Sequence, residues 1–236
     1  MPGLINFSAT GGYGAVTVRP WESITIEDDG EPLVPLDAGA VSLEAPPPYL
    51  ALGAPYGAFG PWFLRASVYA RLLDAQRRLG EVLPGWRLHL LDAWRPLAVQ
   101  AFMVAHTEAQ LRRESPELSE QALRERVLTY WAPPSDDAAR PPPHSTGAAV
   151  DVTLRDAQGE VADMGSPFDE PTERSWPGHF ESSRPEVHRR RMALAEVMRE
   201  AGFVGHRQEW WHFSHGDRAW ARELGLPVAR YGRTAP

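Results

Sequence analysis

The sequence predicts an α+β fold with a central mixed or antiparallel sheet flanked by helices. Segments with helical spacing of apolar residues alternate irregularly with short strand-like runs, and the strands have short connections. The chain has 236 residues, 43% of them hydrophobic and 23% charged, which is the composition of a globular domain large enough to bury a core. No internal repeat is visible in it.

Two regions are predicted along the chain: an N-terminal arm over residues 1–48, extended or with a short hairpin at its start, and one domain over residues 49–236. The arm is rich in Pro and Gly, with short β-type runs at residues 16–18 and 23–26. At the end of the arm, the sequence Pro46-Pro47-Pro48 interrupts any helix or strand.

The first half of the domain is predicted to hold two helices around a strand. Residues 65–83 form a helix because apolar side chains recur at spacings of three and four until Pro84 stops the pattern. Residues 86–92 read as a strand that enters the core. A helix over residues 96–113 follows, with its proline at the first helical position.

The second half continues with a helix, a strand and two helices, expected at residues 119–131, 147–154, 186–201 and 217–224. Ser119 and Asp217 are candidate N-caps, and Gly202 ends the helix expected at residues 186–201. In the strand, the branched residues at even positions share the core face, whereas Asp151 lies on the opposite, smaller and more polar face.

Composition excludes several mechanisms. The chain has no Cys, so thiolate nucleophiles and Cys-ligated metals are impossible. Every one of its 24 basic residues is Arg, which excludes Schiff-base chemistry on Lys. The net charge of -7 argues against nucleic acid or an anionic membrane as the main partner, and no apolar run is long enough to span a bilayer. The start of the chain lacks the features of a secretory signal, so a cytoplasmic protein is expected. The sequence leaves the oligomeric state open.

Two short motifs bring metal-binding chemistry together. His144 in a loop is followed seven residues later by Asp151 in the predicted strand, and Glu209 precedes His212 by three residues. Imidazole nitrogens and a carboxylate oxygen suit a divalent zinc ion, and three protein ligands leave a position open for water. For Glu209 and His212 to face one site, the backbone must bend between them, with Glu209 in the loop before the strand.

Plainer interpretations exist for each residue. The residues of the His144 and Asp151 pair could be ordinary parts of a zinc-free core, and Arg95 could be a surface residue at the end of its strand. Among the other histidines, His215 is the most credible alternative ligand. A metal that is purely structural, in a domain that only binds, is a further possibility.

The motifs together resemble the VanX-type D-alanyl-D-alanine dipeptidases, zinc D,D-peptidases that share a fold with the Hedgehog signalling domain. The resemblance rests on His144-x2-Gly147-x-Ala149-x-Asp151, Glu209-Trp210-Trp211-His212 and Asp92-Ala93-Trp94-Arg95-Pro96, supported by Met164-Gly165, Phe168-Asp169 and the stretch over residues 56–79. It covers residues 49–226. Several motifs in the correct order make coincidence improbable.

The resemblance implies a role for each of these residues. His144, Asp151 and His212 are the ligands of one zinc ion per chain, and Glu209 is the general base for the attacking water. Arg95 stabilises the oxyanion on the scissile carbonyl. Asp169 is the carboxylate best placed by motif to bind the free amine of a dipeptide.

One position departs from the family. The family commonly has Ser two residues before the first His ligand, where it helps to hold the substrate's amine, and this chain has Pro142. Amine recognition must then rest on the Pro142 carbonyl oxygen, on Asp169 or on another group.

The resulting expectation is a zinc peptidase that hydrolyses D-Ala-D-Ala or a related dipeptide. The nearest rival is a D,D- or L,D-carboxypeptidase or endopeptidase that acts on peptidoglycan peptides through a more open cleft. Glu209 and Arg95 weigh against a purely structural metal, because such a metal requires neither.

Overall fold

A five-stranded mixed sheet forms the centre of the protein, which is described here from a computed structural model over residues 20–236. The order of its strands is β3 (Ser42–Leu43), β5 (Arg87–Asp92), β6 (Ala149–Arg155), β8 (His212–Ser214) and β7 (Val204–Gly205). β3 pairs with β5 in parallel and the other neighbours are antiparallel. The predicted fold class is therefore confirmed.

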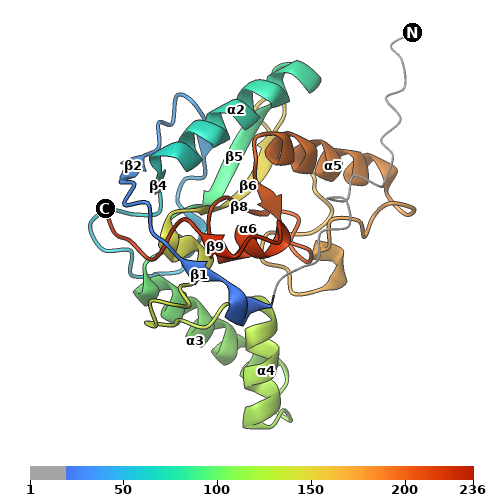
Figure 1. The fold of residues 1–236 in the computed structure, drawn as a ribbon. Coiled ribbons are helices and arrows are strands. Elements are labelled where there is room, and N and C mark those ends of the chain that lie inside the picture. The colour runs from blue at the N-terminus through green and yellow to red at the C-terminus, as the bar shows by residue number, and fades with distance from the viewer. Residues whose placement is uncertain (1–19) are drawn as a thin grey trace.

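Two helices, α2 (Ala66–Val82) and α5 (Pro185–Glu200), pack side by side against the sheet (Figure 1). The main core lies between these helices and the strands. It includes Val150, Val152 and Leu154, which confirms the predicted phase of β6 and leaves Asp151 on the other face. The predicted spans of both helices agree with the structure to within one or two residues.

A separate apolar cluster is shared by α1 (Pro48–Ala51), α3 (Leu97–Glu114) and α4 (Glu120–Tyr130). α3 and α4 lie next to each other in Figure 1. Ser119 caps α4 as predicted, because its side chain accepts a hydrogen bond from the Ala122 amide. The prediction that Pro96 is the first helical residue is wrong by one position. Its ψ of 156° is extended, so Pro96 is the N-cap and Leu97 begins the helix.

Residues 20–48 lie along the domain and contribute strands to it. β1 (Thr25–Ile26) pairs in parallel with the last strand, β9 (Val228–Ala229), and β2 (Leu33–Pro35) pairs with β4 (Phe63–Arg65). The β-type run at residues 16–18 falls outside the described residues, and the division of the chain at residue 48 stays a prediction.

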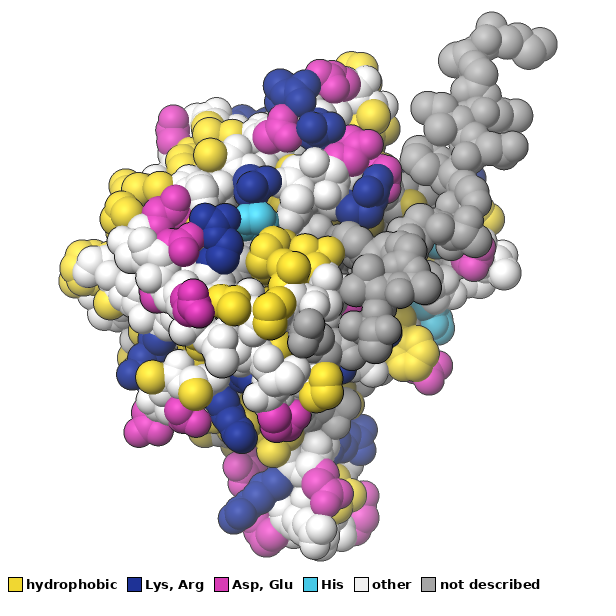
Figure 2. Space-filling model, in the orientation of Figure 1, with side chains coloured by type: hydrophobic (Ala, Val, Ile, Leu, Met, Phe, Trp, Pro, Cys, Tyr) yellow, Lys and Arg dark blue, Asp and Glu magenta, His cyan; other side chains and the backbone are white. Residues whose placement is uncertain are grey.

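The remaining elements are short. They are η1 (Trp21–Ser23), η2 (Pro143–Thr146), η3 (Glu173–Ser175) and α6 (Arg218–Glu223). Asp217 caps α6 as predicted, by accepting from the Trp220 amide. Acidic and basic side chains are interspersed on the face shown in Figure 2. None of the helices in residues 20–236 combines the length and the apolar character needed to cross a membrane.

Candidate metal centre

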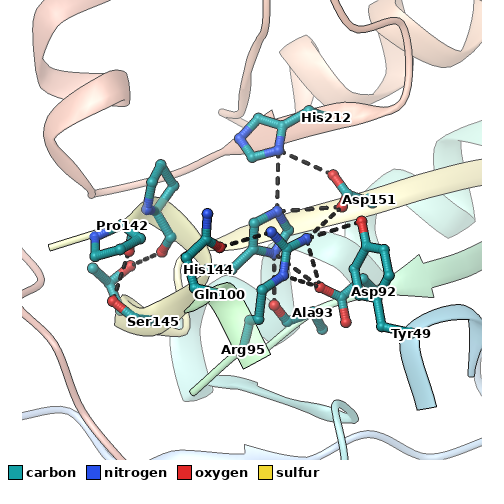
Figure 3. Close-up of polar contacts among 12 residues, drawn as sticks. Tyr49, Asp92, Ala93, Arg95, Gln100, Pro142, His144, Ser145, Asp151 and His212 are labelled. Atoms are coloured by element: carbon teal, nitrogen blue, oxygen red, sulfur yellow. Dashed lines mark hydrogen bonds and ion pairs between the residues drawn. The ribbon is translucent and has the colours of Figure 1, made fainter. Parts of the chain in front are cut away.

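Three side chains converge where β6, β8 and η2 meet. The ligand atoms of His144, Asp151 and His212 all lie within 4.8 Å of one another, and all three residues are buried. Figure 3 shows the three side chains pointing toward one another. Asp151 and His212 are cross-strand partners in the antiparallel pair of β6 and β8, so the sheet register itself brings them together.

The 3-10 turn η2 carries His144, and backbone contacts from distant segments hold this turn in place. The Arg65 side chain donates to the Thr146 carbonyl oxygen over 2.9 Å, and the Thr234 amide donates to the Ser145 carbonyl oxygen over 3.0 Å. Gly147 ends the turn at φ 69°, where a Cβ atom would stand 2.2 Å from the Leu33 side chain. Only glycine fits this position without displacing its neighbour.

Hydrogen bonds fix which ring nitrogen of each histidine faces the centre. His144 Nδ1 lies 2.7 Å from the Ala93 carbonyl oxygen and must donate to it, which leaves Nε2 without a proton in the neutral ring. Ser214 donates to Asp217 over 2.8 Å, so its oxygen accepts from His212 Nε2 at 3.4 Å. His212 Nδ1 is then the bare nitrogen. Such outer partners are typical of metal-binding histidines.

The two imidazole nitrogens lie at the spacing of ligands around a tetrahedral metal ion, and each of them is close to one oxygen of Asp151. His144 Nε2 lies 3.2 Å from His212 Nδ1 and 3.3 Å from an Asp151 oxygen, and His212 Nδ1 lies 3.0 Å from the other Asp151 oxygen. A tetrahedron with metal–ligand bonds of about 2.0–2.1 Å has edges of roughly 3.3 Å. Two nitrogen lone pairs and a carboxylate at this separation repel one another unless a cation lies among them.

The electrostatics of the cluster also favour a cation. Burial raises the pKa of Asp151, but the two imidazoles outweigh burial and hold the pKa of this carboxyl well below its ordinary value. Burial alone would lower the pKa of His212. The hydrogen bond and the charge of the Asp151 carboxylate outweigh burial, so the pKa of His212 is raised above its ordinary value. The centre therefore attracts positive charge.

Glu209 lies beside this cluster, and the backbone bends as expected to bring it there. It occupies the loop before β8, and its Oε2 atom lies 4.0 Å from His212 Nδ1 and 3.6 Å from His206 Nδ1. Its side chain is 24% exposed, so water reaches it. A carboxylate at this distance from a candidate metal ligand is in a position to move protons.

Arg95 is buried in the site, which rules out its interpretation as a surface residue. Its Nε donates to Asp92 over 2.9 Å and its Nη2 lies 3.4 Å from Asp151. Nη2 also donates to the Tyr49 hydroxyl over 3.2 Å, and Nη1 donates to Gln100 over 3.0 Å. One N–H of Nη1 is left without a partner among the described residues.

Asp92 reaches this site because of a bulge in β5. Leu90 pairs with Val152, but the next paired residue is Asp92, opposite Asp151, so one extra residue is inserted at Leu91. The insertion turns Asp92 from the core face to the face of Asp151. Asp92 then accepts hydrogen bonds from Arg95 and from Tyr56, the latter over 2.7 Å.

Asp169 lies in the long loop after β6, and Tyr49 contacts both it and Arg95. Its carboxylate accepts a hydrogen bond from the Tyr49 hydroxyl over 2.8 Å, and its backbone has a left-handed φ of 60°. Desolvation and the nearby charge of Asp151 raise the pKa of Asp169 well above its ordinary value. Tyr49 thus connects Asp169 with Arg95, a link that sequence reasoning missed.

Two alternatives from the sequence are corrected by the structure. His215 is not part of the cluster, because its Nδ1 donates to the Gly202 carbonyl oxygen over 2.8 Å and its ring packs against Trp220. The Pro142 carbonyl oxygen accepts two hydrogen bonds from Ser145, one from the amide and one from the hydroxyl (Figure 3). Both of its lone pairs are engaged, so it is not available to bind an amine.

Comparison with known proteins identifies the family of this chain. A family model described as D-ala-D-ala dipeptidase matches residues 57–227, almost the whole domain. The chain belongs to this family. It is therefore a peptidase, and the resemblance seen in the sequence motifs is confirmed.

Relatives of this peptidase carry the same description. A D-alanyl-D-alanine dipeptidase of Synechocystis is 38% identical over 240 aligned positions, which cover 92% of this chain and 97% of the relative. One of Enterococcus faecium is 36% identical over 135 positions, covering 55% and 62% of the two chains. One of Escherichia coli is 50% identical over 70 positions, covering 30% and 36%.

Two solved structures also resemble this peptidase. The LD-carboxypeptidase LdcB aligns with a TM-score of 0.48 and 13% identity over 86% of this chain and 78% of its own. The vancomycin resistance D,D-pentapeptidase VanY, solved in complex with Zn(II), aligns with a TM-score of 0.42 and 16% identity over 88% and 96%.

Proposed function

We propose that this peptidase is a zinc-dependent dipeptidase that hydrolyses D-Ala-D-Ala or a closely related dipeptide, with one zinc ion per chain. The observation that carries the proposal is the convergence of the ligand atoms of His144, Asp151 and His212 within 4.8 Å, with Glu209 beside them. Neutral imidazoles together with one carboxylate suit zinc better than Mg²⁺ or Ca²⁺, which favour oxygen ligands and higher coordination.

When bound, zinc would lower the pKa of a water molecule to about 7 and polarise the scissile carbonyl. Glu209 takes a proton from the attacking water and passes it to the leaving amine. Its position 4.0 Å from His212 Nδ1 supports this role. Proton transfer by a positioned carboxylate contributes roughly 10²–10⁴ in rate.

Arg95 stabilises the negative charge that develops on the carbonyl oxygen in the transition state. The contacts of its Nε, Nη1 and Nη2 atoms hold the guanidinium still beside Asp151. A donor that is fixed in advance does not need to reorganise during the reaction.

Asp169 binds the free ammonium group of the substrate, and the Tyr49 hydroxyl holds its carboxylate in place. An ammonium cation would offset the desolvation and the repulsion from Asp151 that raise the pKa of Asp169. Because the Pro142 oxygen is engaged, Asp169 is the acceptor that remains from the candidates in the sequence.

The test compares kcat/KM for D-Ala-D-Ala and its N-acetyl form. A dipeptidase that reads the free amine cleaves D-Ala-D-Ala and cleaves the acetylated form at least tenfold less efficiently, about 1.4 kcal/mol of transition-state binding. Equal or better turnover of the acetylated form would support the D,D- or L,D-carboxypeptidase alternative and leave the zinc chemistry intact.

A further inference from the structure

A large cleft opens from the catalytic carboxylate toward α3. It has a volume of about 790 Å³, and its inner end is lined by Tyr49, Asp169, Glu209 and Trp211. The cleft continues between α3 on one side and the loop from Phe168 to Trp176 on the other. It is therefore continuous with the proposed site and is not a separate cavity.

This volume exceeds what D-Ala-D-Ala needs. A water molecule occupies about 30 Å³ in the liquid, so the roughly eleven heavy atoms of D-Ala-D-Ala fill at most about 330 Å³. Less than half of the cleft would be used, and the rest would hold water against apolar side chains. Burying a larger apolar group there would release this water and strengthen binding.

The walls of the cleft are aromatic at the inner end. The rings of Tyr49 and Trp131 lie 5.8 Å apart, those of Tyr49 and Phe168 5.7 Å, and those of Phe168 and Trp211 5.5 Å. Contacts between rings hold these side chains in place before any ligand binds. A preformed apolar wall of this kind is suited to a bulky side chain.

The charge of the cleft determines which end of a substrate enters it. Among residues 20–236, five carboxyl groups line it, those of Glu114, Asp169, Glu170, Glu173 and Glu209, and no guanidinium does. One of the five, Glu170, is paired with Arg174 at 3.3 Å. A negative cleft repels the carboxyl end of a dipeptide and attracts its amine end.

We propose that the cleft binds the side chain of the substrate's amino-terminal residue. Size and charge together favour a free dipeptide whose first residue carries a large, cationic side chain. This inference rests on the proposed function, because it takes Asp169 as the partner of the substrate's ammonium group. It assigns to the outer cleft a role in specificity.

The experiment measures kcat/KM of the zinc-loaded, full-length protein for four free dipeptides that share D-Ala at the carboxyl end. The first residues are D-Ala, D-Phe, D-Arg and D-Glu. We expect D-Phe-D-Ala to exceed D-Ala-D-Ala by roughly tenfold, which is typical of filling an apolar pocket. D-Arg-D-Ala should be at least as good as D-Phe-D-Ala, and D-Glu-D-Ala should be the poorest of the larger substrates.

Two variants of α3 locate the effect in the cleft. His106 lines the cleft, and Ala105 beside it is exposed and does not. His106→Trp should lower the ratio of kcat/KM for D-Phe-D-Ala over D-Ala-D-Ala by roughly tenfold, because the indole occupies the space. Ala105→Trp adds the same group to the same helix and should leave this ratio unchanged.

A second pair tests charge. Glu173 lines the cleft and is exposed, whereas Glu117 is exposed outside it. Glu173→Gln should reduce the preference for D-Arg-D-Ala over D-Phe-D-Ala, and Glu117→Gln, with the same change in net charge, should not.

The outcomes separate this inference from the proposed function. If D-Ala-D-Ala is cleaved and every larger dipeptide is poorer, the cleft is not a side-chain subsite and the inference is wrong. If N-acetylated or longer peptides are best, the cleft holds a peptide backbone, which also overturns it. If the zinc-loaded protein cleaves none of the peptides, the proposed function itself has failed.

Discussion

Arg95→Lys is predicted to weaken the fold as well as catalysis, although it keeps the charge. The guanidinium uses three nitrogens to reach Asp92, Gln100, Tyr49 and Asp151 at 2.9 to 3.4 Å, and Arg95 is only 5% exposed. Lysine has one nitrogen with three N–H donors at the end of a flexible stem, so at least one of the four acceptors loses its donor. Hydrogen bonds to a charged group are worth about 1.5–3 kcal/mol each, so the free energy of unfolding should fall by at least that amount.

Urea unfolding at a fixed zinc concentration measures the loss of stability, and kcat for D-Ala-D-Ala measures the loss of catalytic activity. Arg78→Lys on α2 is the matched control, because Arg78 is paired with Asp74 and Glu200 at the surface and should change stability by less than about 0.5 kcal/mol. If Arg95→Lys stays within about 1 kcal/mol of the parent protein and keeps its kcat, the guanidinium network does not have the role described here.

Three further changes test separate parts of the site. Glu209→Gln should keep zinc and lower kcat by at least roughly a hundredfold, because an amide cannot accept the proton; near-normal turnover would move the base elsewhere. Asp151→Ala should remove most zinc and activity together, and full zinc occupancy by elemental analysis would show that the ligand assignment is wrong. Burial, assisted by the charge of Arg71, lowers the pKa of His215 from 6.5 to about 4, so the unfolded chain binds a proton in this range that the folded chain does not. Stability should be full above pH 6.5 and fall as the pH drops toward 4, by up to about 3 kcal/mol, and His215→Gln should flatten that part of the profile in urea unfolding.

Local patterns in the sequence predicted most of the fold. The spans of α2, α5 and β6 follow from the spacing of apolar residues, and the caps at Ser119 and Asp217 follow from the chemistry of their own side chains. These features depend on residues within a few positions of one another, which is why a single sequence reveals them.

The links that complete the site were not predictable in this way. Tyr49 contacts Arg95, which lies 46 positions further along the chain, and Asp169, which lies 120 positions further. It directly follows three prolines, at the first residue of the predicted domain. The bulge that turns Asp92 toward Asp151 also leaves no signal, because it depends on how two strands pair.

Loop length locates only part of the wall of the site. Two loops, residues 132–143 and 159–185, are long enough to reach it, and the second supplies Asp169 and Trp176 to the cleft. The first contributes no side chain to the lining of the cleft, and the preceding Trp131 does so instead. Loop length shows that a segment can reach a site, whereas tertiary packing decides where it lies.

Metal dependence on D-Ala-D-Ala tests the central claim most directly. The protein is treated with a chelator, dialysed, and assayed for released D-Ala as zinc is added back. We predict that activity is lost with the metal and returns in proportion to zinc, reaching its maximum at about one zinc per chain. Full activity in protein that elemental analysis shows to be free of metal would contradict the assignment of His144, Asp151 and His212 as a catalytic metal centre.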